Sequence, residues 1–217
     1  MAIRIVIADD HSVLRLGLRT LLDMQPDMEV VGEAGDGRAL LATVRETLPD
    51  VVIMDVGMPN LNGMEATREA LDIHPTLRVL ALSGFSNEPY VAGMLRAGAC
   101  GYLLKSCEFE ELASAVRTVM SGRVYLSAGV AGTVLEGYLS HLDEGHPEPA
   151  AVLSHREREV LQLLAEGLAT KAIAHRLNLG ERTVETHRRQ IMEKLNMRSV
   201  AELTKYAIRQ GLTSLED

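Results

Sequence analysis

The stretch IRIVIADDHSVLRLGLRTLL, residues 3–22, decides how the first half of the chain folds. A run of β-forming residues ends abruptly at two adjacent carboxylates, Asp9 and Asp10, and a helical pattern follows at once. Adjacent like charges repel, so a pair of aspartates at the end of a buried strand requires an explanation. Four leucines after the pair are spaced for one face of a helix: Leu14, Leu18, Leu21 and Leu22.

The same strand-then-helix unit recurs along the first half of the sequence. Short apolar runs occupy residues 3–8, 28–34, 50–55, 78–83 and 101–105. Amphipathic stretches follow them at residues 12–23, 37–47, 62–73, 87–97 and 108–121. This alternation predicts βαβ units on a parallel sheet. We therefore expect a doubly wound (βα)5 domain of the α/β class, with about 125 residues, a usual size for one domain.

A second, smaller domain is predicted after a linker. Residues 127–142 carry the apolar spacing of one more helix, and DEGHPEPA (143–150) has the prolines and acids of a connecting segment. The residues that follow show only helical periodicity. The predicted parts are a first domain at 1–124, a helical and acidic linker at 125–150, and an all-α domain at 151–217.

Charge separates these parts. The net charge is −6 for residues 1–127, −4 for 128–152 and +2 for 153–217, which sum to the −8 of the whole chain. An acidic front and a basic rear indicate two modules with different partners, and the basic one is a candidate for nucleic acid.

Composition excludes several classes of protein. With 217 residues, 47% of them hydrophobic, the chain is long enough to fill two cores. Cys100 and Cys107 lie outside any CxxC pair, so we expect neither a disulfide framework nor a cysteine metal site. No apolar run approaches the roughly 20 residues of a membrane span, and no signal-peptide pattern opens the chain. We expect a cytoplasmic protein without a membrane partner.

Polar side chains stand at the ends of four of the predicted strands. In an open parallel sheet, sites form beyond the carboxyl ends of the strands. The residues at those ends are Asp9 and Asp10 (first strand), Asp55 (third), Ser83 (fourth) and Lys105 (fifth).

These residues suit phosphoryl chemistry. Three carboxylates with one ammonium stay net negative, so a cation is expected among them. Mg²⁺ suits because it takes oxygen ligands and keeps waters that a phosphate can replace, and Mn²⁺ is the alternative. Asp55 is placed as nucleophile, since carboxylates form acyl phosphates. Lys105 would hold one phosphoryl oxygen and Ser83 would donate to another. Helix capping explains a single aspartate but not the whole set.

The residues around these positions resemble a bacterial response-regulator receiver domain. The resemblance rests on the Asp9-Asp10 pair, on DVGMPNLNG around Asp55, on Ser83 and on GYLLKS around Lys105. It covers roughly residues 1–124 and implies a flavodoxin-like fold.

The resemblance also implies roles for individual residues. Asp55 would be the phosphoacceptor, and Mg²⁺ would be bound by the side chains of Asp10 and Asp55, the carbonyl of Gly57, and Asp9 through water. Ser83 and Tyr102 would form a switch pair, in which the hydroxyl turns to the phosphate and the aromatic ring moves inward behind it. Lys105 would be the phosphate-binding lysine.

Helix boundaries are clear in the second domain. Ser154 with Glu157 forms a capping box that opens one helix. A second capping box, Ser199 with Glu202, opens the last helix.

Between these two helices the sequence has the outline of a helix-turn-helix. Thr170 is expected to cap a short helix, and Gly180 to cap a longer one that runs to about Leu195. A short helix, a tight turn and a longer helix are the order of elements in that motif.

The longer helix has one apolar and one polar face. Val184, Ile191 and Leu195 share the first, and a polar face of this kind enters the major groove of DNA in helix-turn-helix proteins. The expected base contacts are Arg189 to guanine, Thr186 to a thymine methyl or an adenine edge, and Glu185 to cytosine, with Arg182 on the same face. Expected phosphate contacts are Arg188, Lys194, Lys171 and Lys205, together with the backbone N–H groups near Thr183. A solvated face on a small helical bundle is the simpler alternative.

This second module resembles the LuxR-type DNA-binding domain, through its LSxREREVL opening and the helix ERTVETHRRQIMEKL. With the receiver in front, the whole chain resembles a NarL/FixJ-family response regulator. The resemblance implies transcription regulation, in which a cognate sensor histidine kinase phosphorylates Asp55 and alters dimerisation and DNA binding. The implied partners are that kinase, a double-stranded DNA operator, RNA polymerase, and a second copy of the chain when phosphorylated or on DNA, contacted through residues 199–210. No enzyme activity is expected beyond self-phosphorylation and slow dephosphorylation.

Three other classes of protein are alternatives to a response regulator. A flavodoxin needs a loop rich in glycine and hydroxyls after the first strand, where Asp9 and Asp10 would repel the phosphate of a flavin. A hydrolase of acyl phosphates is harder to separate, because its chemistry is the same. A DNA-binding protein indifferent to phosphorylation would have no use for the pairing of Asp55 with Lys105.

Overall fold

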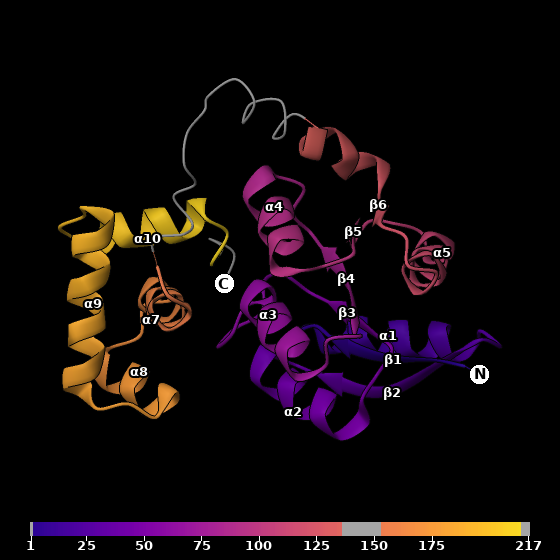
Figure 1. The fold of residues 1–217 in the computed structure, drawn as a ribbon, viewed down its shortest axis with the longest axis horizontal. Helices are drawn as coiled ribbons and strands as arrows, with labels where there is room; N and C mark the ends of the chain where they lie inside the picture. Colours follow the sequence, from indigo (N-terminus) through magenta and orange to yellow (C-terminus); the bar gives the residue numbers. More distant parts are fainter. Residues whose placement is uncertain (1, 136–152, 214–217) are drawn as a thin grey trace. The chain divides into compact units, whose positions relative to one another are not determined.

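The computed structural model describes residues 2–135 and 153–213, and the chain divides into two compact units, Met1–Leu142 and Asp143–Asp217. Figure 1 shows the ribbon of both units, and each is described by itself. The predicted domain limits at 1–124, 125–150 and 151–217 are not tested by this division.

The first unit is built on a parallel sheet, as expected. Its strands are β1 (Ile3–Ala8), β2 (Met28–Ala34), β3 (Val51–Met54), β4 (Arg78–Ser83), β5 (Gly101–Leu104) and β6 (Tyr125–Leu126). They lie in the order β2-β1-β3-β4-β5-β6, and every pairing is parallel. The chain adds strands to one side of β1 first and then to the other side, beginning with β3. The boundary between β1 and β3 is therefore the topological switch point, where sites form in doubly wound sheets.

Helices cover both faces of this sheet (Figure 1). They are α1 (Ser12–Asp23), α2 (Gly37–Thr47), α3 (Gly63–Ile73), α4 (Glu88–Ala97) and α5 (Phe109–Met120). One core cluster joins the sheet to α1 and α5, and the other joins it to α2, α3 and α4. All four residues of β3 are buried, which explains its uninterrupted apolar sequence.

The sixth strand was not predicted. Residues 125–126 pair with β5, in the register Gly101↔Tyr125 and Tyr102↔Leu126. A helix follows over residues 128–135, and its Val130 is fully buried in the core cluster beside α4. The first part of the predicted linker therefore packs on the first unit. The remaining residues of the predicted helix at 127–142 and the whole of 143–150 lie outside the described residues.

The second unit is helical, as predicted. It contains α7 (His155–Ala165), α8 (Thr170–Leu177), α9 (Glu181–Leu195) and α10 (Val200–Arg209), which enclose one apolar core. Both capping boxes are present, Ser154 with Glu157 at α7 and Ser199 with Glu202 at α10. In each box two backbone N–H groups at the helix start donate to side-chain oxygens.

One predicted cap is wrong. Ala169 is the N-cap of α8, and Thr170 is the first residue of that helix. The Thr170 hydroxyl instead donates to Glu185 Oε1 of α9 at 2.6 Å. Gly180 is the N-cap of α9, as expected, and the turn before it is made possible by Asn178 in the left-handed conformation at φ 53°. Within residues 2–135 and 153–213, no helix combines the length and the apolar character needed to cross a membrane.

Candidate functional site

The register of the sheet brings the predicted strand-end residues to one edge. Ala8 pairs with Met54, so Asp9 and Asp55 leave neighbouring strands at the same level. Ser83 pairs with Leu104 on the other side, and Lys105 follows directly. The Lys105 ammonium lies 2.8 Å from Asp9 Oδ2 and 2.8 Å from Asp55 Oδ2. The three residues therefore form one ion-pair cluster.

Burial sets the electrostatics of this cluster. Asp55 is 4% exposed and Asp9 is 2% exposed. Burial raises the pKa of Asp55 above its ordinary value, and the charge of Asp9 adds to that, against the hydrogen bond from Lys105. Burial lowers the pKa of Lys105, but its hydrogen bonds to Asp55 and Asp9 outweigh burial and leave that pKa raised. Lys105 therefore stays an ammonium, and the cluster keeps an excess of negative charge.

The donor atoms of this cluster fit a hard divalent cation. One ligand atom from each of Asp9, Asp10, His11 and Asp55 lies within 4.8 Å of all the others. Asp10 Oδ1 is buried, and no donor among the described residues forms a hydrogen bond with it. A buried carboxylate oxygen left without a donor costs free energy unless a cation joins it. The set is dominated by carboxylates, which Mg²⁺ and Mn²⁺ prefer.

Ser83 and Tyr102 meet through a residue that the sequence analysis did not single out. Both are fully buried. The backbone N–H of Phe85 donates to Ser83 Oγ at 3.1 Å, and the Tyr102 hydroxyl donates to the Phe85 carbonyl at 2.7 Å. The Phe85 ring stacks on Tyr90 of α4, with 4.3 Å between ring centroids. Burial raises the pKa of the Tyr102 phenol well above its ordinary value, so the hydroxyl stays a donor. Sequence spacing carries no signal for the role of Phe85.

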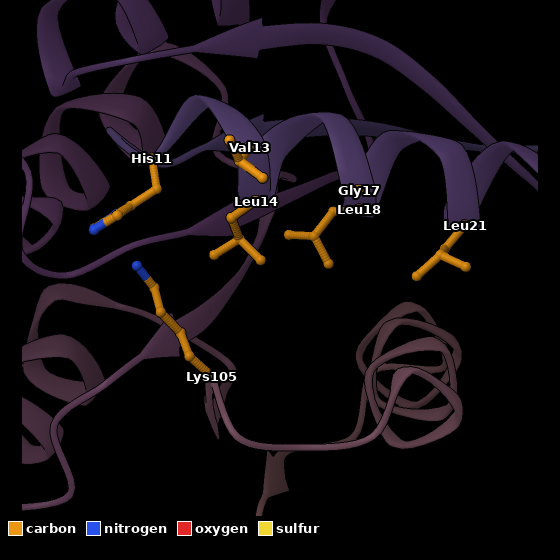
Figure 2. A pocket seen from close by; sticks show the side chains of 7 residues that line it. All are labelled: His11, Val13, Leu14, Gly17, Leu18, Leu21 and Lys105. Carbon is orange, nitrogen blue, oxygen red and sulfur yellow. The ribbon is translucent and has the colours of Figure 1, made fainter.

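An apolar groove of about 510 Å³ begins beside the acids and runs along α1. Figure 2 shows His11 at the start of α1, Lys105 reaching toward it from the end of β5, and apolar side chains along the helix. Val13, which lines the groove, is 84% exposed, and the neighbouring Leu16 is 65% exposed. Exposed apolar side chains on neighbouring positions are a common feature of interaction surfaces.

The predicted polar face of α9 is exposed, and its apolar face is in the core. Val184 and Ile191 are buried, and Leu195 packs against the same cluster. Arg189 is exposed and lies 3.9 Å from Glu193 one turn on, a weak surface pair that DNA could replace. The exposed or half-buried residues predicted to face DNA are Arg182, Thr183, Glu185, Thr186 and Arg188.

Some of these groups already have partners inside the unit. Glu185 accepts from the Thr170 hydroxyl, and the Thr186 hydroxyl donates to the Arg182 carbonyl at 2.9 Å. The backbone N–H of Thr183 donates to the Gly180 carbonyl at 2.9 Å, within the first turn of α9.

Lys194 differs most from its predicted role as a phosphate contact. Its ammonium lies 2.7 Å from Oε2 of Glu157, which is 3% exposed and belongs to the capping box of α7. The pair joins α9 to α7. Lys171 and Lys205 are exposed on α8 and α10, as a phosphate contact requires.

Comparison with known proteins identifies both units. Residues 5–117 match the family model described as a response regulator receiver domain, and residues 151–207 match the model for bacterial regulatory proteins of the luxR family. The oxygen regulatory protein NreC of Staphylococcus carnosus (strain TM300) is 39% identical over 213 residues, which covers 96% of this chain and 98% of that protein.

Solved structures of similar proteins match this chain over nearly its whole length. The response regulator ChrA of a heme-sensing two-component system is 35% identical, with a TM-score of 0.52, over 97% of this chain and 98% of that one. A structure of two RcsB dimers bound to two parallel DNAs is 25% identical, with a TM-score of 0.59, over 97% of this chain and 99% of that one.

Proposed function

This chain belongs to the response regulators, joining a receiver domain to a LuxR-type DNA-binding domain that regulates transcription, and we propose that transfer of a phosphoryl group to Asp55 controls its binding to DNA. The observation that carries this proposal is the position of Asp55, which is buried at the switch point of the sheet with Lys105 at 2.8 Å.

The two oxygens of Asp55 are not equivalent, and this supports one of them as nucleophile. Oδ2 is held by Lys105, whereas Oδ1 accepts only a long hydrogen bond of 3.4 Å from the Gly57 N–H. Oδ1 would attack phosphorus, so that the new P–O bond forms as the bond to the donor breaks. Lys105 would then turn to an oxygen of the phosphoryl group, and Ser83 would donate to another.

We assign the cation site to the acid cluster, with Mg²⁺ as the cofactor and Mn²⁺ as a substitute. The side chains of Asp10 and Asp55 and the carbonyl of Gly57 would be direct ligands, and Asp9 would act through a water. When bound, the ion neutralises charge on the phosphoryl oxygens during transfer. Asp10 Oδ1, which is buried and accepts no hydrogen bond from the described residues, supports this assignment.

The phosphoryl donor would be a sensor histidine kinase, whose phosphohistidine loses its P–N bond as Asp55 gains the phosphoryl group. The groove along α1 offers such a partner an apolar surface beside the acceptor. Chemistry on this protein would then be limited to its own phosphorylation and slow dephosphorylation. This protein would act in the cytoplasm, where DNA and RNA polymerase are its further partners and a second copy pairs with it on DNA.

Switching would use the chain of contacts from Ser83 through Phe85 to Tyr102. Turning the Ser83 hydroxyl toward a phosphoryl oxygen would break its hydrogen bond from the Phe85 N–H. The carbonyl of the same residue holds Tyr102, so the loop and α4 would respond together. A local change of this kind biases a two-state element, which is how phosphorylation switches proteins in general.

For DNA, we propose that α9 enters the major groove with Arg182, Glu185, Thr186 and Arg189 facing the bases. The alternative contacts made by Glu185 and Thr186 would be exchanged for contacts with bases. Phosphates would be contacted by Arg188, Lys171 and Lys205 and by the hydroxyl of Thr183. Since Lys194 is engaged with Glu157, we give it a structural role instead.

The direct test of the acceptor is mass spectrometry after incubation with acetyl phosphate and Mg²⁺. The wild-type chain should gain one phosphoryl group, and Asp55→Asn should gain none because no nucleophile remains. Asp72→Asn, a change of an exposed aspartate on α3, is the matched control and should behave as wild type. Persistent labelling of Asp55→Asn would remove Asp55 as the acceptor.

Arg189→Ala tests the reading of bases by α9. Loss of a bidentate contact to guanine should weaken binding by about 1–3 kcal/mol at the preferred sequence and much less on random DNA. The measurement is fluorescence anisotropy with both DNAs at one salt concentration. An equal loss on both would make Arg189 a phosphate contact.

A further inference from the structure

His11 occupies the N-cap position of α1, but its side chain makes no capping hydrogen bond with the helix. The imidazole Nδ1 lies 2.9 Å from Asp9 Oδ1 and 2.7 Å from Asp10 Oδ1. The side chain is 66% exposed, so burial in a core does not account for this position. Figure 2 shows His11 and Lys105 at the same end of the groove along α1.

The neighbours of Nδ1 decide which nitrogen carries hydrogen. Ionised carboxylates only accept hydrogen bonds, so the nitrogen that faces two of them must carry its hydrogen. Nδ1 is therefore a donor, and it donates to Asp9 Oδ1. A nitrogen with its hydrogen in this bond has no lone pair to offer a metal ion.

His11 completes the set of donors around Asp9. The backbone N–H of His11 donates to the same Oδ1 at 2.8 Å, and Lys105 binds Oδ2 at 2.8 Å. Asp9 thus has donors on both oxygens. A carboxylate held in this way is fixed in orientation and is poorly available as a direct ligand.

Asp10 is in the opposite situation. Its Oδ1 is close to His11 Nδ1 but makes no hydrogen bond with it, because the Nδ1 hydrogen is directed to Asp9. The carboxylate of Asp10 therefore keeps free lone pairs. The imidazole of His11 thus orients the carboxylate of Asp9 and leaves the carboxylate of Asp10 available to bind a cation.

The geometry points to His11 as a positioning residue for the cation of the acid cluster. It fixes Asp9 through its ring and backbone N–H groups and so leaves Asp10 as the side chain that meets the ion. This inference rests on the proposed function, because it concerns the same cation site. Groups that orient ligands in this way typically change metal affinity by about 10-fold to 100-fold when removed.

The test is calorimetric titration of the full chain with Mg²⁺ and with Mn²⁺. His11→Ala should weaken both ions by about 10-fold or more. His11→Asn should restore most of the affinity, because its amide N–H is able to reach Asp9. His74→Ala, at the C-terminal end of α3, is the matched control and should leave both affinities unchanged.

Titration with Ni²⁺ separates positioning from direct ligation, since Ni²⁺ prefers an imidazole ligand more strongly than Mg²⁺ does. If His11→Ala loses Ni²⁺ but keeps Mg²⁺, His11 is a ligand and the inference is wrong. Unchanged affinity for all three ions would also overturn it. A wild-type chain that binds no Mg²⁺ would instead count against the proposed function, and Asp10→Asn, which should abolish binding, shows that the assay reports this site.

Discussion

At the scale of single residues, the reactivity of Asp55 and its cost to stability have one origin. A carboxylate becomes a useful nucleophile when it is poorly solvated, and Asp55 is 4% exposed beside a second buried acid, Asp9. The same burial raises the pKa of Asp55 and makes its charged form costly in the absence of a cation. Sites of this kind trade stability for function.

Replacing Asp55 should therefore stabilise the metal-free protein. A carboxyl whose folded-state pKa is raised loses stability as pH increases from its ordinary value through the folded value, and the loss is complete above that. At pH 7, Asp55→Asn should therefore raise the free energy of unfolding of the first unit, and its Tm should rise with it. Calorimetry in a chelating buffer measures this.

Low pH and added Mg²⁺ test whether the buried charge of Asp55 causes the expected stabilisation. Well below the ordinary pKa of an aspartate, about 3.9, the difference between Asp55→Asn and wild type should shrink, because Asp55 is then protonated in both the folded and the unfolded state. Saturating Mg²⁺ should reverse the order of the two Tm values, since only the wild type keeps all the ligands. If Asp55→Asn melts below wild type at pH 7 without metal, its pairing with Lys105 outweighs its burial.

At the scale of secondary-structure elements, most of the fold could be predicted from the sequence. Apolar runs bounded by turn residues gave β1, β3 and β4 because strands buried on both faces leave no other pattern. Capping boxes located α7 and α10 because their hydrogen bonds are local. β6 has only two residues, and its pairing with β5 depends on tertiary contacts that no local pattern encodes.

The sequence predicts the charged residues of the candidate site but not the contacts that link them to their surroundings. The strand-end acids and Lys105 follow from topology, and they meet as expected. The links through Phe85 use its backbone N–H and carbonyl, which any residue type possesses, so the sequence carries no trace of them. The contacts of His11 with Asp9 and Asp10 could not be predicted, because a single histidine in a sequence carries no signal for its neighbours in space. Lys194 was assigned to phosphate because its charge is visible in the sequence and its partner Glu157 is not.

The pair between α7 and α9 gives a prediction at this scale. Lys194→Met should lower the free energy of unfolding of the second unit by about 1–3 kcal/mol, because it leaves the buried Glu157 carboxylate without its cation. Urea unfolding of the full chain, followed by far-ultraviolet circular dichroism, measures this loss.

Lys205→Met is the matched control, since Lys205 is exposed on α10 and proposed to contact phosphate. It should leave stability unchanged and reduce the dependence of DNA affinity on salt by about one counterion. The opposite pattern, with Lys194→Met changing the salt dependence and not stability, would return Lys194 to the DNA interface.

At the scale of the whole molecule, two segments of opposite net charge carry two chemistries. Residues 1–127 have a net charge of −6 and hold the acid cluster, whereas residues 153–217 have a net charge of +2 and present α9. The acidic segment suits a cation and a phosphoryl group, and the basic segment suits the DNA backbone. We propose that phosphoryl transfer at Asp55 governs the binding of DNA by α9.

Selection of genomic DNA fragments by the purified full chain tests that claim most directly. It is done with and without beryllofluoride and Mg²⁺, which together mimic the phosphoryl group on Asp55. We expect one enriched sequence motif whose affinity increases when the mimic is present, and no such increase for Asp55→Asn. Equal enrichment of the same motif in both conditions would contradict it, because DNA binding would then be independent of the acceptor site.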